Sequence, residues 1–447
     1  MSISEKQQYM LKSLKKYLQQ IPMSGFLANL GKLMSGTGLA HLIGVAIIPV
    51  LTRLFTPEEI GIYATYLSLF IILSSVASLR YEYATLIPRT DQEANNITVL
   101  SSILVTGFSL LLLLVFLIAK GPVTRLLGVG SLGWLIYLLP FSIFSFGMFM
   151  VLLFRLNREK RYSAMAAGKI TGTGVMSAGQ ITMGWMQLQQ AGLILGKVAG
   201  DLSAMLLMFW KLRKIQRSVM SGVSPQRMMA MAKRYRNFPF WNAPHALTAT
   251  TSYNIPVLLF YNFFSEAVAG YYAMAVKALY IPVQVIAQAV LQVFGQRIAE
   301  KRANRERLIP FMNSTLLLLC GIGIVPFLLL FLFSPPLFDW FLGSGFETTG
   351  YYVRILTPFV FLVFLVTPLN FIPLMLNRQR KAFVIDLVNL AARVAALATG
   401  IWYQSVEMAL ILYTISGVCI NTYLLFWFYH IARKAEMESF LSPASPK

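Results

Sequence analysis

The chain has 447 residues, of which 57% are hydrophobic and 12% charged, and its mean hydropathy is +0.65. Because soluble domains carry about a quarter charged residues, this composition excludes a soluble globular protein and indicates an integral membrane protein. The net charge of +21 comes from short clusters between apolar runs, which argues against nucleic-acid binding. The two cysteines lie inside apolar runs and the three histidines are scattered, so we expect neither a disulfide framework nor a metal site.

Residues 1–23 form a basic tail, which we place on the cytoplasmic side of the membrane. Met10, Leu14, Tyr17 and Ile21 recur at helical spacing among lysines, a pattern typical of an amphipathic helix that lies on a membrane surface. A solvated cationic tail that only sets the orientation of the chain explains the same residues. The sequence leaves both interpretations open.

The best-defined element of the sequence begins after the turn at Thr56. This residue is placed to cap a helix, Pro57 suits the first helical position, and Glu59 stands where a capping-box acid belongs. Residues 60–79 carry no charge, and a helix of ~20 residues crosses a ~30 Å hydrocarbon core. Arg80 then marks a cytoplasmic boundary.

Charge-free runs of this length predict about twelve transmembrane helices, with short loops and no inserted soluble domain. Their expected limits are 24–50, 60–82, 95–119, 131–154, 162–185, 190–210, 238–261, 267–296, 308–333, 351–376, 382–403 and 407–430. If the N-terminus is cytoplasmic, 29 of the 38 lysines and arginines fall in cytoplasmic segments and only 3 on the other side. The positive-inside rule therefore predicts twelve spans with both termini in the cytoplasm.

Three short motifs occur twice, in the same order, at offsets of 209, 215 and 220 residues. They are Gly61-Ile62-Tyr63-Ala64 with Gly270-Tyr271-Tyr272-Ala273, Leu127-Gly128 with Leu342-Gly343, and Asn157-Arg158 with Asn377-Arg378. This repetition predicts two parallel six-helix halves, related by an axis along the membrane normal. The expected domains are an N-lobe (24–210), a basic cytoplasmic linker (211–237), a C-lobe (238–430) and a cytoplasmic C-terminal tail (431–447).

Ionisable residues inside the predicted spans are the first candidates for function, because each is costly in hydrocarbon. If such cations line the space between the halves, the path is electropositive and suits an anionic substrate. Lys277 and Arg393 lie about 15 Å into their spans by helical rise, which favours function. Snorkelling or pairing between helices is the alternative for the others. The candidate cations are Lys277, Arg393, Lys169, Arg354, Lys32 and, at a span boundary, Arg80.

The few intramembrane acids have basic residues nearby in the sequence. Lys197 and Asp201 are four residues apart, so they share a helix face and we expect them to pair. Asp386 and Arg393 are seven residues apart and also share a face. These acids are therefore candidates for structural partners or for coupling to an ion.

Two sets of neutral polar residues also fall inside spans. His41 and His245 occupy equivalent places in the two halves, where they serve either as packing residues or in a proton-linked role. A stripe of glutamines at four-residue intervals is suited either to sugar hydroxyls or to joining helices. The stripe consists of Gln284, Gln288 and Gln292, followed by Gln296.

No catalytic arrangement stands out, so we expect a protein that is not an enzyme and has no cofactor. Residues 192–197 (GLILGK) resemble a phosphate-binding loop, but one residue is missing between the glycines and Val198 replaces the Ser or Thr. Glu58 and Glu59 are explained by helix capping. Without a nucleotide motif, the driving forces left open are an ion gradient (H⁺ or Na⁺) and downhill removal of a product.

Several motifs together resemble those of one family of membrane proteins. The stretch Leu51-Thr52-Arg53-Leu54-Phe55-Thr56-Pro57-Glu58, with Gly61 and Tyr63 and then Leu79-Arg80-Tyr81-Glu82-Tyr83-Ala84, is similar to polysaccharide (O-antigen-type, Wzx-like) flippases. These belong to the multidrug/oligosaccharidyl-lipid/polysaccharide exporter (MOP) superfamily. Phe238-Pro239, Ile281-Pro282 and Leu342-Gly343 are similar as well, so the likeness runs nearly from end to end.

The resemblance implies an all-α integral membrane protein with about 12 transmembrane helices in two pseudo-symmetric six-helix lobes, as in MATE transporters, around a cationic cavity. It also implies the substrate, an undecaprenyl-diphosphate-linked oligosaccharide such as an O-antigen repeat unit. That substrate moves from the cytoplasmic to the periplasmic leaflet of a bacterial inner membrane. The implied partners are membrane lipids and the polymerase and chain-length regulator of the same pathway.

The function expected from the sequence is therefore that of a flippase working by alternating access. A cation-coupled multidrug antiporter of the same superfamily is one alternative, but it requires unpaired acids, which this chain has few of. An integral-membrane glycan polymerase or transferase is another alternative. Its substrate usually needs a sizeable external loop, and the largest one expected here spans only about 334–350.

Overall fold

The computed structural model describes residues 39–441, apart from 214–221, 305, 344 and 377. The amphipathic segment expected near the N-terminus, Lys32 and the last six residues lie outside this range. The described residues form helices joined by short connectors, with no strand among them. Each of the twelve predicted spans overlaps a helix or a run of consecutive helices.

The first half of the described chain forms the N-lobe, in which α10 packs along α9 and α8, and α7 packs on α8. Its helices are α3 (Leu39–Ala46), α4 (Ile48–Leu54), α5 (Pro57–Ser74), α6 (Tyr81–Ala84), α7 (Asp91–Leu127), η2 (Gly130–Tyr137), α8 (Leu138–Arg158), α9 (Tyr162–Trp185) and α10 (Gln189–Leu212).

The second half forms the C-lobe, in which α15 packs on α16 and α18 packs on α19. Its helices are η3 (Phe238–Asn242), α13 (Ala243–Phe263), α14 (Glu266–Ala303), α15 (Ile309–Leu342), α16 (Glu347–Val366), η4 (Thr367–Asn370), α17 (Phe371–Met375), α18 (Gln379–Trp402) and α19 (Val406–Leu441). Within the described chain, seven helical segments of the two lobes are long and apolar enough by themselves to cross a membrane.

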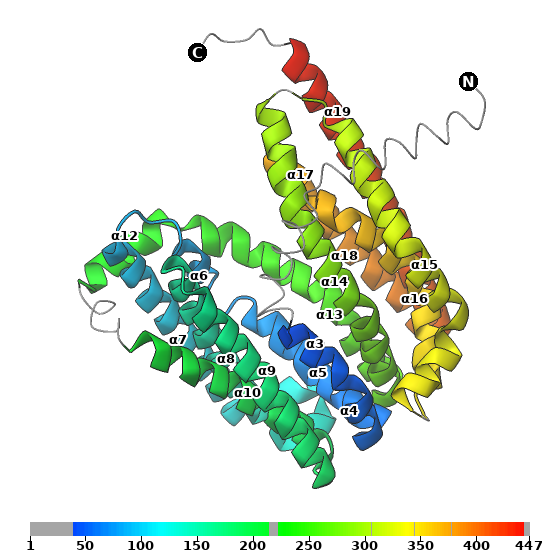
Figure 1. Ribbon diagram of the computed structural model, residues 1–447. Coiled ribbons are helices and arrows are strands. Elements are labelled where there is room, and N and C mark those ends of the chain that lie inside the picture. The colour runs from blue at the N-terminus through cyan, green and yellow to red at the C-terminus, as the bar shows by residue number, and fades with distance from the viewer. Residues whose placement is uncertain (1–38, 214–221, 305, 344, 377, 442–447) are drawn as a thin grey trace, which may run out of the picture.

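The two lobes meet through α5, α13 and α14 and spread apart towards α12 and the C-terminal end of α19 (Figure 1). We call the end that holds α12 the basic end, because the connectors 75–90 and 159–161 and most of the charged linker lie there. The other end, which holds the connectors 55–56 and 264–265, is the closed end.

The start of α5 has the geometry that its sequence predicts. The Glu59 amide donates to the Thr56 hydroxyl, and the Thr56 amide donates to the Glu59 carboxylate at 3.0 Å. This capping box satisfies two backbone donors that a helix start leaves without partners. The prediction that these residues form a helix cap is confirmed, and it explains the acids without a catalytic role.

Several helices depart from the sequence-based limits: α5 ends at Ser74 rather than at residue 82, and α7, α14 and α15 extend beyond their predicted ends. Two segments predicted to lie outside the spans also contain helix. The predicted linker contains a helix, α12 (Pro225–Arg234), which packs on the N-lobe: Tyr81 Oη donates to the Ala232 carbonyl at 2.9 Å, and Arg234 pairs with Glu93 at 2.8 Å. The C-terminal tail was expected from residue 431, but α19 continues to Leu441. Burial of Ile431 and Ala432 against the C-lobe explains this extension, because it offers the helix an apolar surface beyond the membrane span.

Candidate substrate path between the lobes

The lobes are in closest contact where α5 crosses α14, at the paired glycines of the internal repeat. A Cβ added to Gly61 would lie 3.0 Å from the Gly270 nitrogen, and one added to Gly270 would lie 3.1 Å from the Gly61 nitrogen. Each added Cβ would also overlap a carbonyl oxygen of the opposite lobe, that of Glu266 or of Pro57. Only glycine allows two helix backbones to approach this closely.

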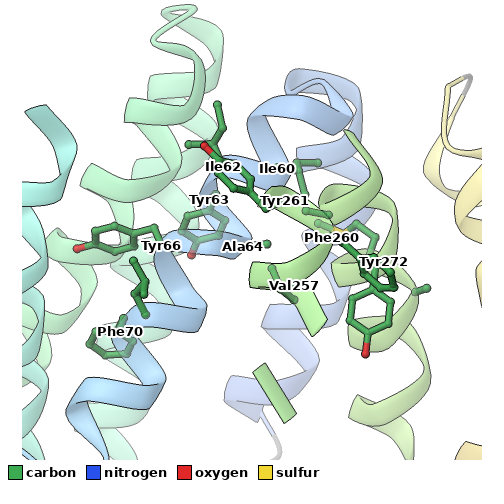
Figure 2. Close-up of a cluster of buried hydrophobic side chains, with 14 of the residues drawn as sticks. Ile60, Ile62, Tyr63, Ala64, Tyr66, Phe70, Val257, Phe260, Tyr261 and Tyr272 are labelled. Atoms are coloured by element: carbon green, nitrogen blue, oxygen red, sulfur yellow. The ribbon is translucent and has the colours of Figure 1, made fainter. Parts of the chain in front are cut away.

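Apolar side chains from both lobes surround this crossing. Figure 2 shows Ile60 and Tyr63 of α5 in one buried cluster with Val257 and Phe260 of α13 and Tyr272 of α14. Ile60 and Phe260 are 1% and 0% exposed. Side chains of both lobes are therefore excluded from solvent at this level.

Three polar contacts join the lobes at the closed end. The Thr52 hydroxyl donates to the Leu342 carbonyl at 2.7 Å, and the Asn262 amide donates to the Leu127 carbonyl at 2.9 Å. The Ser131 hydroxyl is hydrogen-bonded to the Glu266 carboxylate. Together with the glycine crossing, these contacts form a seal, which we define as the crossing and its three polar contacts.

A stripe on α14 leads from this seal towards the basic end. Gly270, Lys277 and Gln284 are seven residues apart, so they lie on one face of the helix. Gly270 contacts the N-lobe and is buried, Lys277 is half-buried, and Gln284 is exposed. This face of α14 is turned to the N-lobe at Gly270. The exposure of its side chains therefore increases towards the basic end, where the two lobes separate (Figure 1). Lys277 is ~17 Å along α14 by helical rise from Glu266, near the middle of a membrane.

Arg80 lies at the basic end in a strained turn. Leu79 and Arg80 both have left-handed backbone angles, with φ of 52° and 65°, which non-glycine residues rarely adopt. The guanidinium stacks on the Tyr83 ring and donates to its hydroxyl at 2.9 Å, while its Nε has no partner among the described residues. Since α6 contacts η3 of the C-lobe, this turn lies beside the separating lobes.

Glu82 lies next to Arg80 in the connector between α5 and α7, outside the helices that cross the membrane. Its side chain is 5% exposed and accepts a hydrogen bond from Ser78. Burial raises the pKa of the Glu82 carboxyl, and the Ser78 hydrogen bond and the charge of Arg80 oppose that shift.

Arg393 lies inside the C-lobe, 1% exposed. Its guanidinium carbon lies 4.9 Å from the centre of the Tyr253 ring and 5.3 Å from those of Phe359 and Tyr413, and Nη1 donates to the Ser252 hydroxyl at 3.2 Å. Aromatic faces attract a cation and offset part of its desolvation. In this conformation a substrate between the lobes does not reach Arg393.

Arg354 donates to two carbonyls of α15 that prolines leave without backbone donors. Pro335 and Pro336 have no amide hydrogens to donate to the carbonyls four residues earlier, those of Phe331 and Leu332. The Arg354 guanidinium donates to these same two carbonyls, at 3.1 and 2.9 Å. Contact between helices was the alternative that the sequence left open for Arg354, and the structure shows such a contact.

Lys197 and Asp201 form the predicted ion pair on α10. The pair is largely buried, and the Lys197 ammonium lies 4.0 Å from the centre of the Phe70 ring. The prediction of an i,i+4 pair is confirmed.

The structure describes only some of the remaining candidates. Asp386 lies 3.3 Å from His245 of α13, whereas Arg393 bonds to Ser252, so these two residues do not pair with each other as their spacing suggested. Lys169 is half-buried on α9. The side chains of His41, Gln288 and Gln292 lie outside the described part of the structure, so no common glutamine face is observed.

Comparisons with known proteins agree with this architecture. A family model described as polysaccharide biosynthesis protein matches residues 50–350. No curated protein sequence matches the chain at a significant level.

The lipid II flippase MurJ in an inward closed conformation is structurally similar, with a TM-score of 0.68 and 14% identity over 92% of each chain. A multidrug resistance MATE family transporter of the MOP superfamily gives 0.64 in its inward-facing conformation, with 16% identity over 93% of this chain and 96% of that one. A MATE family transporter of the MOP superfamily in its outward-facing conformation has a TM-score of 0.61, with 15% identity over 92% of this chain and 96% of that one. Identities this low establish a shared fold only. With the family model matching two thirds of the sequence, the chain belongs to the polysaccharide biosynthesis protein family and has the two-lobed, all-α membrane fold of MATE transporters and MurJ.

Proposed function

We propose that this protein flips a lipid-linked oligosaccharide across the bacterial inner membrane, from the cytoplasmic leaflet at the basic end to the periplasmic leaflet at the closed end. The observation that carries this proposal is the α14 stripe, on which Lys277 lies between the glycine seal and the separated part of the lobes. A structure closed at one end and spread at the other corresponds to one state of an alternating-access cycle.

The chemistry of the substrate explains the need for a fixed cation. A diphosphate is strongly disfavoured in hydrocarbon, and a cation such as Lys277 beside the path lowers that barrier. Gln284, exposed two turns nearer the basic end, is suited to hydrogen bonds with sugar hydroxyls. The lipid tail stays in the bilayer while the sugar head passes between the lobes. An H⁺ or Na⁺ gradient, or removal of the product by a polymerase and chain-length regulator, supplies the direction.

Pairing of the intramembrane acids disfavours a cation-coupled antiporter. Such a mechanism uses acids that are free to bind the coupling ion. Asp201 is held by Lys197, and Asp386 lies next to His245. The flippase therefore fits the charges of the described residues better.

A complementation experiment tests the proposal. A strain lacking the gene should accumulate lipid-linked oligosaccharide that faces the cytoplasm, and the wild-type gene should clear it. We expect Lys277→Ala to reduce export at least tenfold at normal protein levels, and Lys277→Arg to retain most of it, because the charge is kept. Lys233→Ala, which removes an exposed lysine from α12, is the matched control and should export normally.

Each result bears on a different part of the proposal. Normal export by Lys277→Ala would remove α14 from the substrate path but leave the flippase function intact. A deletion strain without cytoplasm-facing intermediates would refute the flippase function itself. If the purified protein extends or transfers the glycan, it is a polymerase or transferase instead.

A further inference from the structure

A groove of about 540 Å³ opens on the side of the N-lobe, between α7, α8 and α10. It lies apart from the helices α5, α13 and α14 that join the lobes. Ile103 and Leu110 of α7 and Phe209 of α10 line it and are exposed at 53%, 60% and 40%. In the most apolar stretch of α7, only 17% of the residues are buried within the protein. The groove therefore lies on the side of the bundle that faces lipid.

Arg155 of α8 lies at the end of this groove nearest the basic end. Its side chain is 2% exposed, and its Nη2 pairs with Glu159 at 2.9 Å. The other two nitrogens, Nε and Nη1, are buried and have no hydrogen-bond partner among the residues that the structure describes. A buried charged donor without a partner is costly, so this end of the groove has two donors suited to an anionic oxygen.

The rest of the groove behaves as an apolar surface. The hydroxyls of Thr98, Ser102 and Thr106 all donate to the backbone carbonyls four residues earlier, at 2.8 to 2.9 Å. The hydrogen of each hydroxyl is therefore already bonded within α7, so these side chains offer a ligand no hydroxyl donor. From Thr98 to Leu110 the groove follows α7 for ~18 Å by helical rise, which is about the depth of one leaflet of a ~30 Å hydrocarbon core.

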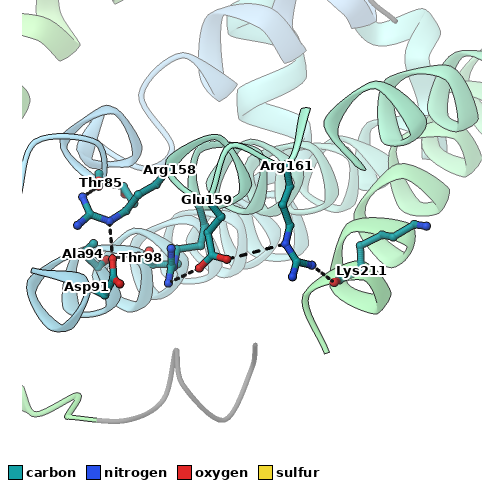
Figure 3. Close-up of polar contacts among 9 residues, drawn as sticks. Thr85, Asp91, Ala94, Thr98, Arg158, Glu159, Arg161 and Lys211 are labelled. Atoms are coloured by element: carbon teal, nitrogen blue, oxygen red, sulfur yellow. Dashed lines mark hydrogen bonds and ion pairs between the residues drawn. The ribbon is translucent and has the colours of Figure 1, made fainter. Parts of the chain in front are cut away.

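The surroundings of Arg155 add positive charge. Figure 3 shows Arg158 paired with Asp91. Glu159 forms ion pairs with Arg155 and with Arg161. Arg161 also donates to the Lys211 carbonyl at 3.5 Å. Basic residues outnumber acidic ones here: they are Arg155, Arg158, Lys160, Arg161, Lys211 and Arg213, against Asp91, Glu93 and Glu159. Such a cluster attracts anionic headgroups.

We propose that this groove binds one acidic phospholipid from the leaflet at the basic end. An acyl chain lies along α7, and the phosphate accepts hydrogen bonds from Nε and Nη1 of Arg155. The two features that a phospholipid combines, a hydrocarbon chain and an adjacent anionic oxygen, are those that the groove and Arg155 supply together. This site is separate from the substrate path proposed above.

Native mass spectrometry of the full-length protein tests this assignment. The protein is titrated with phosphatidylglycerol or with zwitterionic phosphatidylethanolamine. Both lipids carry a phosphodiester that can accept hydrogen bonds from Arg155, but only phosphatidylethanolamine also carries an ammonium, which the surrounding basic cluster repels. We therefore expect one phosphatidylglycerol to bind at least tenfold more tightly than phosphatidylethanolamine. Equal binding of the two lipids would overturn the proposal. Displacement of phosphatidylglycerol by a polyprenyl phosphate at equal concentration would also overturn it and would assign the groove to the substrate's lipid.

A matched pair of glycine substitutions tests the apolar part. Gly107 lines the groove, and a Cβ added there meets nothing within 4 Å, so Gly107→Trp fills the groove without a backbone clash. Gly121, on the same helix, is equally open but does not line the groove. We expect Gly107→Trp to lose the tightly bound phosphatidylglycerol and Gly121→Trp to keep it. Retention by Gly107→Trp would place the lipid elsewhere.

A second set of variants tests the cationic end. Arg155→Gln combined with Glu159→Gln removes both charges of the ion pair, so the net charge of the cluster stays the same. We expect at least a tenfold loss of phosphatidylglycerol binding in a protein that still melts cooperatively. Lys233→Gln, at an exposed lysine of the same basic end outside this cluster, should bind like the wild type. If both variants lose binding equally, general charge attraction holds the lipid and the Arg155 site is refuted.

Discussion

Gly61 and Gly270 are equivalent residues of the internal repeat, and the structure places them against each other, where the backbones of α5 and α14 cross. Each glycine leaves room for a carbonyl of the other lobe. The contact that closes one end of the protein is therefore made by two equivalent residues of the repeat.

We expect Gly61→Ala and Gly270→Ala each to weaken this seal, because an added Cβ forces the two backbones apart, an overpacking that costs about 1–3 kcal/mol. The measurement is the yield of a disulfide between Ser131→Cys and Glu266→Cys, whose parent side chains are hydrogen-bonded across the lobes. Cys320 and Cys419 are first replaced by alanine. Gly44→Ala, where nothing lies within 4 Å of the added Cβ, is the control and should cross-link like the parent. An unchanged yield in Gly61→Ala would show that the glycines do not set the distance between the lobes.

Arg354→Leu should destabilise the C-lobe, because it leaves the carbonyls of Phe331 and Leu332 without donors in an apolar environment. Each unsatisfied carbonyl costs about 1–3 kcal/mol. The thermal midpoint of the detergent-solubilised protein checks this. Adding Pro335→Ala and Pro336→Ala returns two backbone donors and should recover part of the loss. Without such a recovery, the loss must come from other contacts of Arg354.

Arg393→Ala should lower the thermal midpoint and the amount of folded protein, since it removes a cation packed against three aromatic rings and leaves a cavity. Export should fall only in proportion to the folded protein. The comparison is Lys277→Ala, which should lose export with little change in the thermal midpoint. If Arg393→Ala melts normally but does not export, Arg393 belongs to the substrate path, as its depth in the sequence suggested.

Glu82→Gln should stabilise the protein at neutral pH. Burial raises the pKa of Glu82 in the folded state. The carboxyl therefore favours folding at low pH, when it is protonated, and this contribution is lost as pH rises through its folded pKa. The gain in thermal midpoint from Glu82→Gln should accordingly be small near pH 4 and larger near pH 8. Midpoints measured across that range check the sign, and a gain that is largest at low pH would contradict it.

The sequence by itself determined the features that depend on neighbours along the chain. The apolar runs, the capping box at Thr56 and Glu59, and the Lys197–Asp201 pair are set by residues within a few positions of each other, so helical periodicity was enough to predict them. The repeated Gly61 and Gly270 motifs also stood out, but the sequence did not reveal that they touch.

Tertiary structure alone decided the surroundings of three intramembrane cations. In the sequence, Lys277, Arg354 and Arg393 are each a single charge in an apolar span. In the structure, Lys277 lies on the helix face that contacts the other lobe at Gly270, and Arg354 bonds to carbonyls that two prolines leave without donors. Arg393 packs against three aromatic rings inside the C-lobe. Arg155 follows the predicted span 131–154 and was not a candidate from the sequence. Its burial in a groove depends on residues of α7 and α10 that lie more than 40 positions away in sequence. The cost of burying a charge depends on the partners that the fold brings to it, and those partners are not neighbours in sequence.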